Sequence, residues 1–190
     1  IIICINYKME EQKDLSVIIP VLNEESNIKK LHSQLENVLL KLNFSFEIVF
    51  VDDGSIDNTF NNLKLLNNVK IIKFKKNFGQ TPAMGAGVFN STGKIIIIMD
   101  GDLQNDPKDI PKLINKIQDG YDVVSGWRYN RKDTFSKKLF SKTSNILRRL
   151  LTNEKIHDSG CSLKAYKREC LEKFEFMGEM HRWIPAILSW

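Results

Sequence analysis

The spacing of apolar and polar residues differs between successive segments of this chain, and the segments predict alternating strands and helices. Short, almost continuous apolar runs are typical of strands that a sheet buries on both faces. Longer segments with apolar residues at three- and four-residue steps are typical of amphipathic helices. We expect strands at 16–20, 46–51, 69–74, 95–99, 121–125 and 161–166. We expect helices at 27–42, after Asp57, from Thr81 onward, and at 107–118, 136–151 and 178–190.

This alternation predicts an α/β fold. Strands that alternate with helices usually form a mainly parallel sheet, so we expect a Rossmann-like sheet with helices on both faces. The chain has 190 residues, of which 42% are hydrophobic, and this suits one domain with a substantial core. We assign residues 15–190 to that domain and residues 1–14 to an N-terminal extension.

The isoleucine-rich strand at 95–99 leads directly into Asp100 and Asp102. Unpaired carboxylates are costly to bury, so both acids should lie at the exposed end of the strand, facing a ligand or a cation. Mg²⁺ commonly binds one or two protein carboxylates together with substrate phosphates. The sequence therefore favours a metal-assisted site for a phosphorylated donor. The alternative is that Asp-Gly-Asp forms only a turn.

Polar and charged residues also follow other predicted strands. Because ligands of open parallel sheets bind beyond the carboxyl ends of the strands, these segments should share one cleft with Asp100 and Asp102. They are 20–24 after the first strand, 52–55 after the second and 126–128 after the fifth. The Asp-Asp-Gly-Ser sequence at 52–55 is also a common turn, and Asp57 is expected to cap the next helix rather than to bind a ligand.

The net charge of +5 permits an anionic partner: nucleic acid, an anionic membrane surface or a phosphorylated substrate. Basic residues in the predicted helix 136–151 fit either an ordinary solvated face or a contact with anionic lipid head groups. We expect no nucleic-acid partner, because aromatic residues interleaved with basic ones, or a recognition-helix pair, are not evident. No apolar run approaches the roughly 20 residues that span a bilayer.

Several segments, taken in order, resemble a known enzyme family. Residues 17–25 (Val-Ile-Ile-Pro-Val-Leu-Asn-Glu-Glu), 51–57 (Val-Asp-Asp-Gly-Ser-Ile-Asp) and 100–107 (Asp-Gly-Asp-Leu-Gln-Asn-Asp-Pro) are similar to family 2 glycosyltransferases of the GT-A fold. Other segments resemble the branch that contains dolichol-phosphate mannosyltransferase and bacterial polyprenyl-phosphate glycosyltransferases. These segments are 125–128, 131–133, 158–166 and 178–182.

The resemblance implies a reaction and its partners. A nucleotide-diphosphate sugar, UDP-glucose-like or GDP-mannose, would donate its sugar to a polyprenyl or dolichyl phosphate with inversion at the anomeric carbon. The cofactor would be Mg²⁺ or Mn²⁺, because a divalent ion stabilises charge on the leaving diphosphate. The enzyme would act at the membrane surface, on the cytoplasmic face. The pattern carries no prediction for the sugar, the base or the oligomeric state.

The resemblance also implies roles for individual positions. Residues at the nucleoside would be Pro20, Leu22 and Glu24, with Asp52 and Asp53 at the base or ribose. Residues around the metal and the donor diphosphate would be Asp100, Asp102 and Gln104, with Arg128 and Arg131 over the phosphates. Asp158 matches the acid near the acceptor. It either shapes its turn, orients the acceptor or metal, or acts as a general base.

Alternative functions remain open at this stage. One is a transferase of the same family that uses a saccharide hydroxyl as acceptor, and another is a fragment that binds nucleotide sugar without activity. A nucleotidyltransferase would instead carry a Gly-rich, basic segment after the first strand, where this chain has Leu22-Asn23-Glu24-Glu25. Family members normally continue with a further strand and a basic acceptor-binding motif, so we expect a C-terminally truncated catalytic domain.

Overall fold

The computed structural model describes residues 11–127, 160–172, 174–176, 178, 180 and 184–188. Within these residues it contains one six-stranded sheet in the order β3-β2-β1-β4-β6-β5. The strands are β1 (Leu15–Val21), β2 (Phe46–Asp52), β3 (Val69–Lys73), β4 (Ile95–Ile98), β5 (Val123–Ser125) and β6 (Lys164–Lys167). The predicted helix 136–151 and the segment 128–159 that contains it lie outside the described residues.

The sheet is mainly parallel, as the strand–helix alternation predicts. β1 pairs in parallel with β2 and with β4, and β2 pairs in parallel with β3. β6 runs antiparallel to both of its neighbours, β4 and β5. In this register Ile98 pairs with Lys164, so the start of β6 lies beside the carboxyl end of β4.

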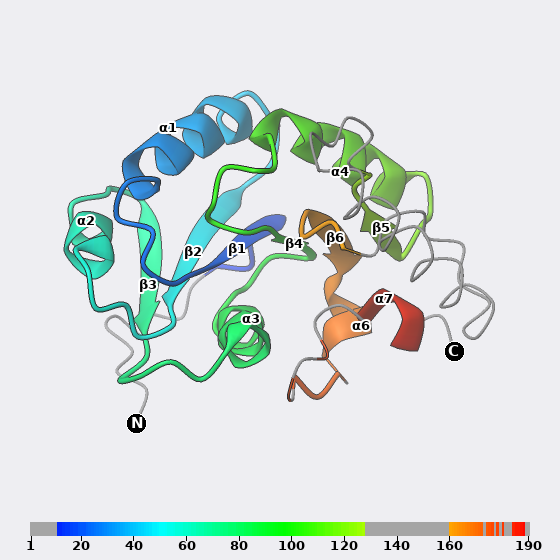
Figure 1. Cartoon of the computed structure of the whole chain (residues 1–190). Helices are drawn as coiled ribbons and strands as arrows, with labels where there is room; N and C mark the ends of the chain where they lie inside the picture. The colour runs from blue at the N-terminus through cyan, green and yellow to red at the C-terminus, as the bar shows by residue number, and fades with distance from the viewer. Residues whose placement is uncertain are drawn as a thin grey trace, which may run out of the picture.

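Helices cover both faces of the sheet (Figure 1). One face carries α1 (Ile28–Leu39), α2 (Thr59–Lys64) and α4 (Ile110–Gln118), whose apolar side chains join the core cluster around Val17, Ile19 and Phe50. The other face carries α3 (Gln80–Phe89), α6 (Arg168–Leu171) and α7 (Ile184–Ile187), which pack on a second cluster around Ile18 and Val51. Successive strand residues therefore enter opposite cores, so each strand is buried on both faces.

Three predicted helices begin or end at slightly different residues in the structure. The helix expected at 27–42 is α1, which ends at Leu39. The one expected at 107–118 is a 3-10 turn (η1, Pro107–Asp109) followed by α4, and Asp106 accepts a hydrogen bond from the Lys108 backbone at its start. The helix expected from Thr81 onward is α3, which begins one residue earlier, at Gln80. The carboxylate of Asp53, in the loop after β2, accepts hydrogen bonds from backbone N–H groups just before the first turn of α3.

The C-terminal part of the described chain differs most from the pattern-based expectation. The strand expected at 161–166 is β6, which begins only at Lys164. Within the predicted helix 178–190, the described residues contain one short helix, α7. No helix among the described residues is long and apolar enough to cross a membrane.

Candidate functional site

The carboxyl ends of β1, β2 and β4 meet at one edge of the sheet. Asp52, the last residue of β2, pairs with Val21, the last residue of β1. Gly101 follows β4 and lies so close to Val21 that a Cβ on it would be 2.7 Å from Val21 Cγ1. The acidic segments after β2 and β4 therefore flank the end of β1. The structure thus brings Asp52 and the Asp100–Asp102 pair to the same edge, as the sequence predicts.

The loops after β1 and β2 are joined by hydrogen bonds. Asn23 accepts from the Ile56 backbone through its side chain, and its own backbone N–H donates to the Ser55 hydroxyl at 2.9 Å. The Glu24 backbone N–H donates to Thr59 Oγ1 at 2.7 Å. These bonds fix the loop that carries two of the predicted nucleoside residues, Leu22, which is 38% exposed, and Glu24, which is half-buried. The third, Pro20, is buried within β1.

Asp52 has an unusual environment for a carboxylate. Its side chain is fully buried, and Oδ1 accepts a hydrogen bond from the Ser55 backbone at 2.9 Å. Oδ2 is buried and has no hydrogen-bond partner in the described part of the chain. A buried carboxylate oxygen without a donor is costly, so native proteins rarely keep one without a reason. Asp52 therefore keeps an acceptor atom that the described residues leave without a donor, beneath the predicted donor site.

Asp53 holds the start of α3. Its two oxygens accept from the backbone N–H groups of Phe78 and Gly79, at 2.8 and 2.9 Å. A carboxylate at a helix N-terminus satisfies orphan donors and favours the helix dipole. This explains why α3 begins before Thr81. The structure thus gives Asp53 a positioning role, whereas its predicted contact with the base or ribose stays a prediction.

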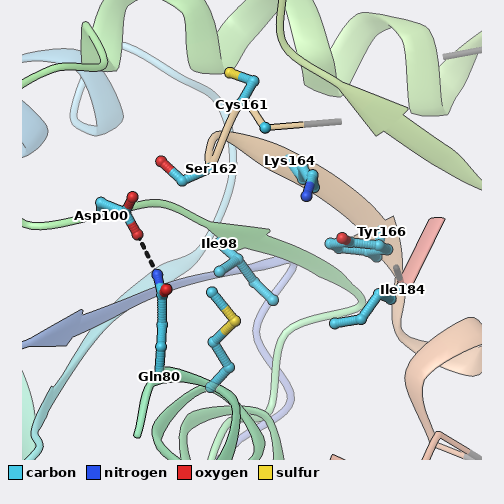
Figure 2. A pocket seen from close by; sticks show the side chains of 10 residues that line it. Gln80, Ile98, Asp100, Cys161, Ser162, Lys164, Tyr166 and Ile184 are labelled. Atoms are coloured by element: carbon cyan, nitrogen blue, oxygen red, sulfur yellow. Dashed lines mark hydrogen bonds between the residues drawn. The ribbon is translucent and has the colours of Figure 1, made fainter. Parts of the chain in front are cut away.

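The loop after β4 presents the predicted metal ligands. Asp100 is half-buried, and Gln80 Nε2 donates to its Oδ1 at 2.6 Å (Figure 2). Asp102 Oδ1 accepts from the Gln104 backbone at 3.0 Å, which closes a tight turn across Leu103. Leu103 has a positive φ of 61°, a strained conformation for a non-glycine residue. Gln104 itself is exposed.

The same loop is tied to the segment before β6. Asn105 Nδ2 donates to the Ser162 hydroxyl at 2.7 Å, and Cys161 Sγ lies 3.5 Å from Asn105 Oδ1. A pocket of ≈ 90 Å³ lies between β4, β6, α3 and α7. Figure 2 shows the side chains around it, with Asp100 and Gln80 at one end. The lining includes Gln80, Asp100, Ser162, Lys164, Tyr166 and Ile184.

Two residues of this arrangement escape sequence reasoning. Gln80 is the first residue of α3, and only the docking of α3 against β4 brings it to Asp100. Lys164 belongs to a strand whose antiparallel position no periodicity reveals. The available signals are a polar residue at a helix start and a lysine in a short strand. Both are too common in proteins to identify a site.

The donor set at this edge suits a hard divalent cation that also binds phosphate. Among the described residues, no three His, Cys, Asp or Glu side chains gather closely enough to hold a metal alone. The Asp100–Asp102 pair, however, offers the one or two carboxylates that Mg²⁺ commonly takes from the protein when phosphates complete its shell. The predicted residues Arg128, Arg131 and Asp158 lie outside the described residues.

The family of the chain follows from comparison with known proteins. Residues 16–174 match the family described as Glycosyl transferase family 2. The chain belongs to this family. The resemblance inferred from the sequence segments and their order along the chain is thereby confirmed.

One curated relative and two solved structures give the family context. The chain is 41% identical over 180 residues to the dodecaprenyl-phosphate galacturonate synthase of Rhizobium johnstonii, covering 91% of this chain and 53% of the relative. It thus spans about half the length of that relative. A glucosyl-3-phosphoglycerate synthase from Mycobacterium tuberculosis, in complex with phosphoglyceric acid, has a TM-score of 0.71 at 18% identity, over 93% of this chain and 64% of that one.

The second structure is a mannosyltransferase from Pyrobaculum calidifontis in complex with GDP-Man and Mn²⁺. It has a TM-score of 0.62 at 20% identity, over 88% of this chain and 48% of that one. At these identities the similarity shows the fold. The predicted GT-A fold is therefore confirmed for this member of glycosyl transferase family 2.

Proposed function

We propose that the protein containing this chain transfers a sugar from a nucleotide-diphosphate sugar to a polyprenyl phosphate, with inversion at the anomeric carbon. The convergence of Asp52, Asp100 and Asp102 on the end of β1 is the observation that carries this proposal. It provides a place for a nucleoside next to a place for a metal-bound diphosphate. The 41% identity to a dodecaprenyl-phosphate galacturonate synthase supports the acceptor class.

The nucleoside would lie over the loops after β1 and β2. Pro20, Leu22 and Glu24 would line its pocket, and Asp52 Oδ2, which has no hydrogen-bond partner among the described residues, would accept a hydrogen bond from the base or ribose. Asp53 would act mainly by holding the backbone of Phe78 and Gly79 at the start of α3. The hydrogen bonds between the two loops keep this surface in place before the donor binds, which lowers the ordering cost of binding.

The diphosphate would lie beside the loop after β4. Asp100, Asp102 and Gln104 would hold Mg²⁺ or Mn²⁺, which supplies Lewis-acid stabilisation of the leaving diphosphate. Gln80 orients the Asp100 carboxylate through its hydrogen bond to Oδ1. Arg128 and Arg131 would add two guanidinium groups, which are suited to bidentate contacts with phosphate oxygens.

The acceptor requires little proton transfer. A polyprenyl phosphate is already an anion at neutral pH, so a strong general base is less necessary than for a sugar hydroxyl. Asp158 would therefore orient the acceptor or the metal, or serve as a weak base. A lipid-linked acceptor places the reaction at a membrane surface, and we assign it to the cytoplasmic face.

Donor binding gives the first test. The melting temperature of the chain is measured with UDP- and GDP-sugars, each with and without Mn²⁺, because a specific ligand raises it by mass action. We expect a metal-dependent increase with one nucleotide, and its loss in Asp102→Ala. Asp119→Ala is the matched control, because Asp119 is an exposed carboxylate paired with Lys116 at the end of α4. No metal-dependent increase with any nucleotide would overturn the donor site.

Acceptor class is tested by transfer. The longer protein that contains this chain is incubated with the radiolabelled donor and either a polyprenyl phosphate or the matching polyprenol. We expect label in the lipid fraction only with the phosphate. Transfer to a saccharide hydroxyl, with none to polyprenyl phosphate, would contradict the proposed acceptor while leaving the donor site intact.

A further inference from the structure

The pocket between β4 and β6 contains a lysine that the donor site does not use. Lys164 is only 5% exposed, although lysine is among the residues least often buried. It lines the ≈ 90 Å³ pocket together with Asp100, Ser162 and Tyr166, as Figure 2 shows. An ammonium group in the lining of a pocket can form a charge-assisted hydrogen bond to an anionic group of a ligand.

The register of the sheet fixes where this ammonium group lies. Lys164 pairs with Ile98, which comes two residues before Asp100. The side chains of Lys164 and Ile98 lie on the same face of the sheet, the one that α3 covers. Lys164 and the predicted metal ligand Asp100 line the same pocket, and Lys164 belongs to the next strand along the sheet.

We propose that Lys164 binds a phosphate oxygen of the acceptor and so places it for attack on the donor sugar. This inference rests on the proposed function. Along the sheet edge, the predicted nucleoside contacts lie at β2 and β1, the predicted metal ligands follow β4, and Lys164 comes next, on β6. Inversion requires the acceptor to approach the anomeric carbon from the side opposite the leaving diphosphate. The β6 side of Asp100 is the side opposite the nucleoside.

Electrostatics supplies a reason for a cation at this position. An acceptor phosphate that approaches the donor diphosphate is repelled by its like charge, and the repulsion is strong where water is excluded. The ammonium group of Lys164 offsets this repulsion. It also selects a phosphate over a neutral hydroxyl, because a buried cation favours an anionic partner.

The other groups in the pocket fit the same role. The Ser162 hydroxyl, which lines the pocket, accepts a hydrogen bond from Asn105 Nδ2. Burial raises the pKa of Tyr166 well above its usual range, so its phenol stays protonated. The pocket accommodates a phosphate group but not a polyprenyl chain, which must leave it on the open side.

The test separates acceptor binding from donor binding. Farnesyl phosphate serves as the acceptor probe, and its binding to the chain loaded with UDP- or GDP-sugar and Mn²⁺ is followed by phosphorus NMR. Lys164→Met removes the charge and keeps an apolar stem suited to neighbours Met84 and Ile98. Lys167→Met is the matched control, since Lys167 is on the same strand and pairs with Asp122 away from the pocket.

We expect Lys164→Met to weaken farnesyl phosphate binding by about tenfold or more, while the donor-induced rise in melting temperature stays as in the parent chain. Lys164→Arg should restore part of the binding, and Lys167→Met should leave it unchanged. Lys164→Gln is a second uncharged variant should methionine disturb the packing.

Three outcomes would overturn the inference. Equal farnesyl phosphate binding by the parent chain and both uncharged variants would remove Lys164 from the acceptor site. A loss of the donor-induced rise in Lys164→Met would assign the lysine to the donor diphosphate instead. Failure of Lys164→Arg to restore any binding would show that the charge is not what matters. If the parent chain itself shows no donor-induced rise, the proposed function fails rather than the role of Lys164.

Discussion

Gln80 and Asp100 join the start of α3 to the end of β4 through a hydrogen bond of 2.6 Å, from Nε2 to Oδ1. The two residues come from different elements, so the bond forms only when α3 is docked against the sheet. The start of α3 is in turn held by Asp53. The acidic loop after β2 therefore supports the orientation of the acidic residue after β4.

Replacing Gln80 should weaken metal binding without unfolding the chain. Partners that orient a metal ligand typically contribute about 10–100-fold to metal affinity. We expect Gln80→Leu to raise the Mn²⁺ concentration needed for the donor-induced rise in melting temperature by about tenfold. Gln118→Leu, at the exposed end of α4, is the control. An unchanged Mn²⁺ requirement in Gln80→Leu would show that Asp100 needs no such support.

Asp52→Asn should change stability and donor binding in opposite directions. The substitution keeps an oxygen for the Ser55 backbone and removes a buried carboxylate, whose Oδ2 has no hydrogen-bond partner among the residues that the structure describes. We expect the free energy of unfolding to rise by about 1 kcal/mol. We expect donor affinity to fall, because the acceptor for the base or ribose is lost. Urea unfolding and donor titration measure the two effects, and a parallel decrease in both would contradict a binding role for Asp52.

Gly54 permits the close approach of the loop after β2 to the segment after β3. It has a φ of 78°, and a Cβ there would lie 2.4 Å from the Lys76 carbonyl carbon. We expect Gly54→Ala to lower the free energy of unfolding by about 2 kcal/mol or more. Gly120→Ala is the matched control, since Gly120 also has a positive φ but no atom of the described residues lies within 4 Å of its Cβ position. Equal losses in the two variants would attribute the effect to backbone strain alone.

Glu47 stabilises the opposite edge of the sheet in a pH-dependent way. Burial alone would raise its pKa, but hydrogen bonds from Ser16 and Thr92 and the charge of Lys70 together lower the pKa below 4.5. Ser16 Oγ donates to Glu47 Oε1 at 2.6 Å, and Lys70 Nζ lies 3.5 Å from Oε2. Because the folded-state pKa is the lower one, this stabilisation is fully present above pH 4.5 and is lost as the pH falls through the folded-state pKa.

Glu47→Gln should therefore be less stable than the parent chain at neutral pH and nearly equal to it in acid. We expect a difference of about 1 kcal/mol in the free energy of unfolding at neutral pH. Urea unfolding at a series of pH values measures it. A difference that persists well below pH 4.5 would show that packing, and not the charge of Glu47, accounts for the loss.

Most of the fold follows from local patterns in the sequence. The apolar run at 95–98 and the three- and four-residue steps of Ile28, Leu31, Leu35 and Leu39 report burial directly, because burial on two faces or on one helix face imposes those periods. The antiparallel insertion of β6 between β4 and β5 does not follow from them. Strand order depends on which edges meet in space, and periodicity contains no information about pairing partners.

Some residues of the candidate site are likewise predictable from the sequence, and others are not. Asp100 and Asp102 were recognisable because two acids directly after an apolar strand require an explanation from solvation. Asp53 was predicted at the donor, and the structure adds its contact with the start of α3. Gln80 and Lys164 were missed because their importance depends on contacts between segments far apart in the chain. Long-range contacts of this kind are set by tertiary packing rather than by spacing.

The position of β6 has a consequence for synthesis of the chain. β4 pairs with β1 on one side and with β6 on the other, and β6 ends at Lys167. Until that residue has left the ribosome, one edge of a strand made of four isoleucines has no partner from this chain. Such an apolar, uncharged edge is a template for aggregation. We therefore expect nascent chains that stall between the fourth and sixth strands to depend on chaperones more than those that stall later.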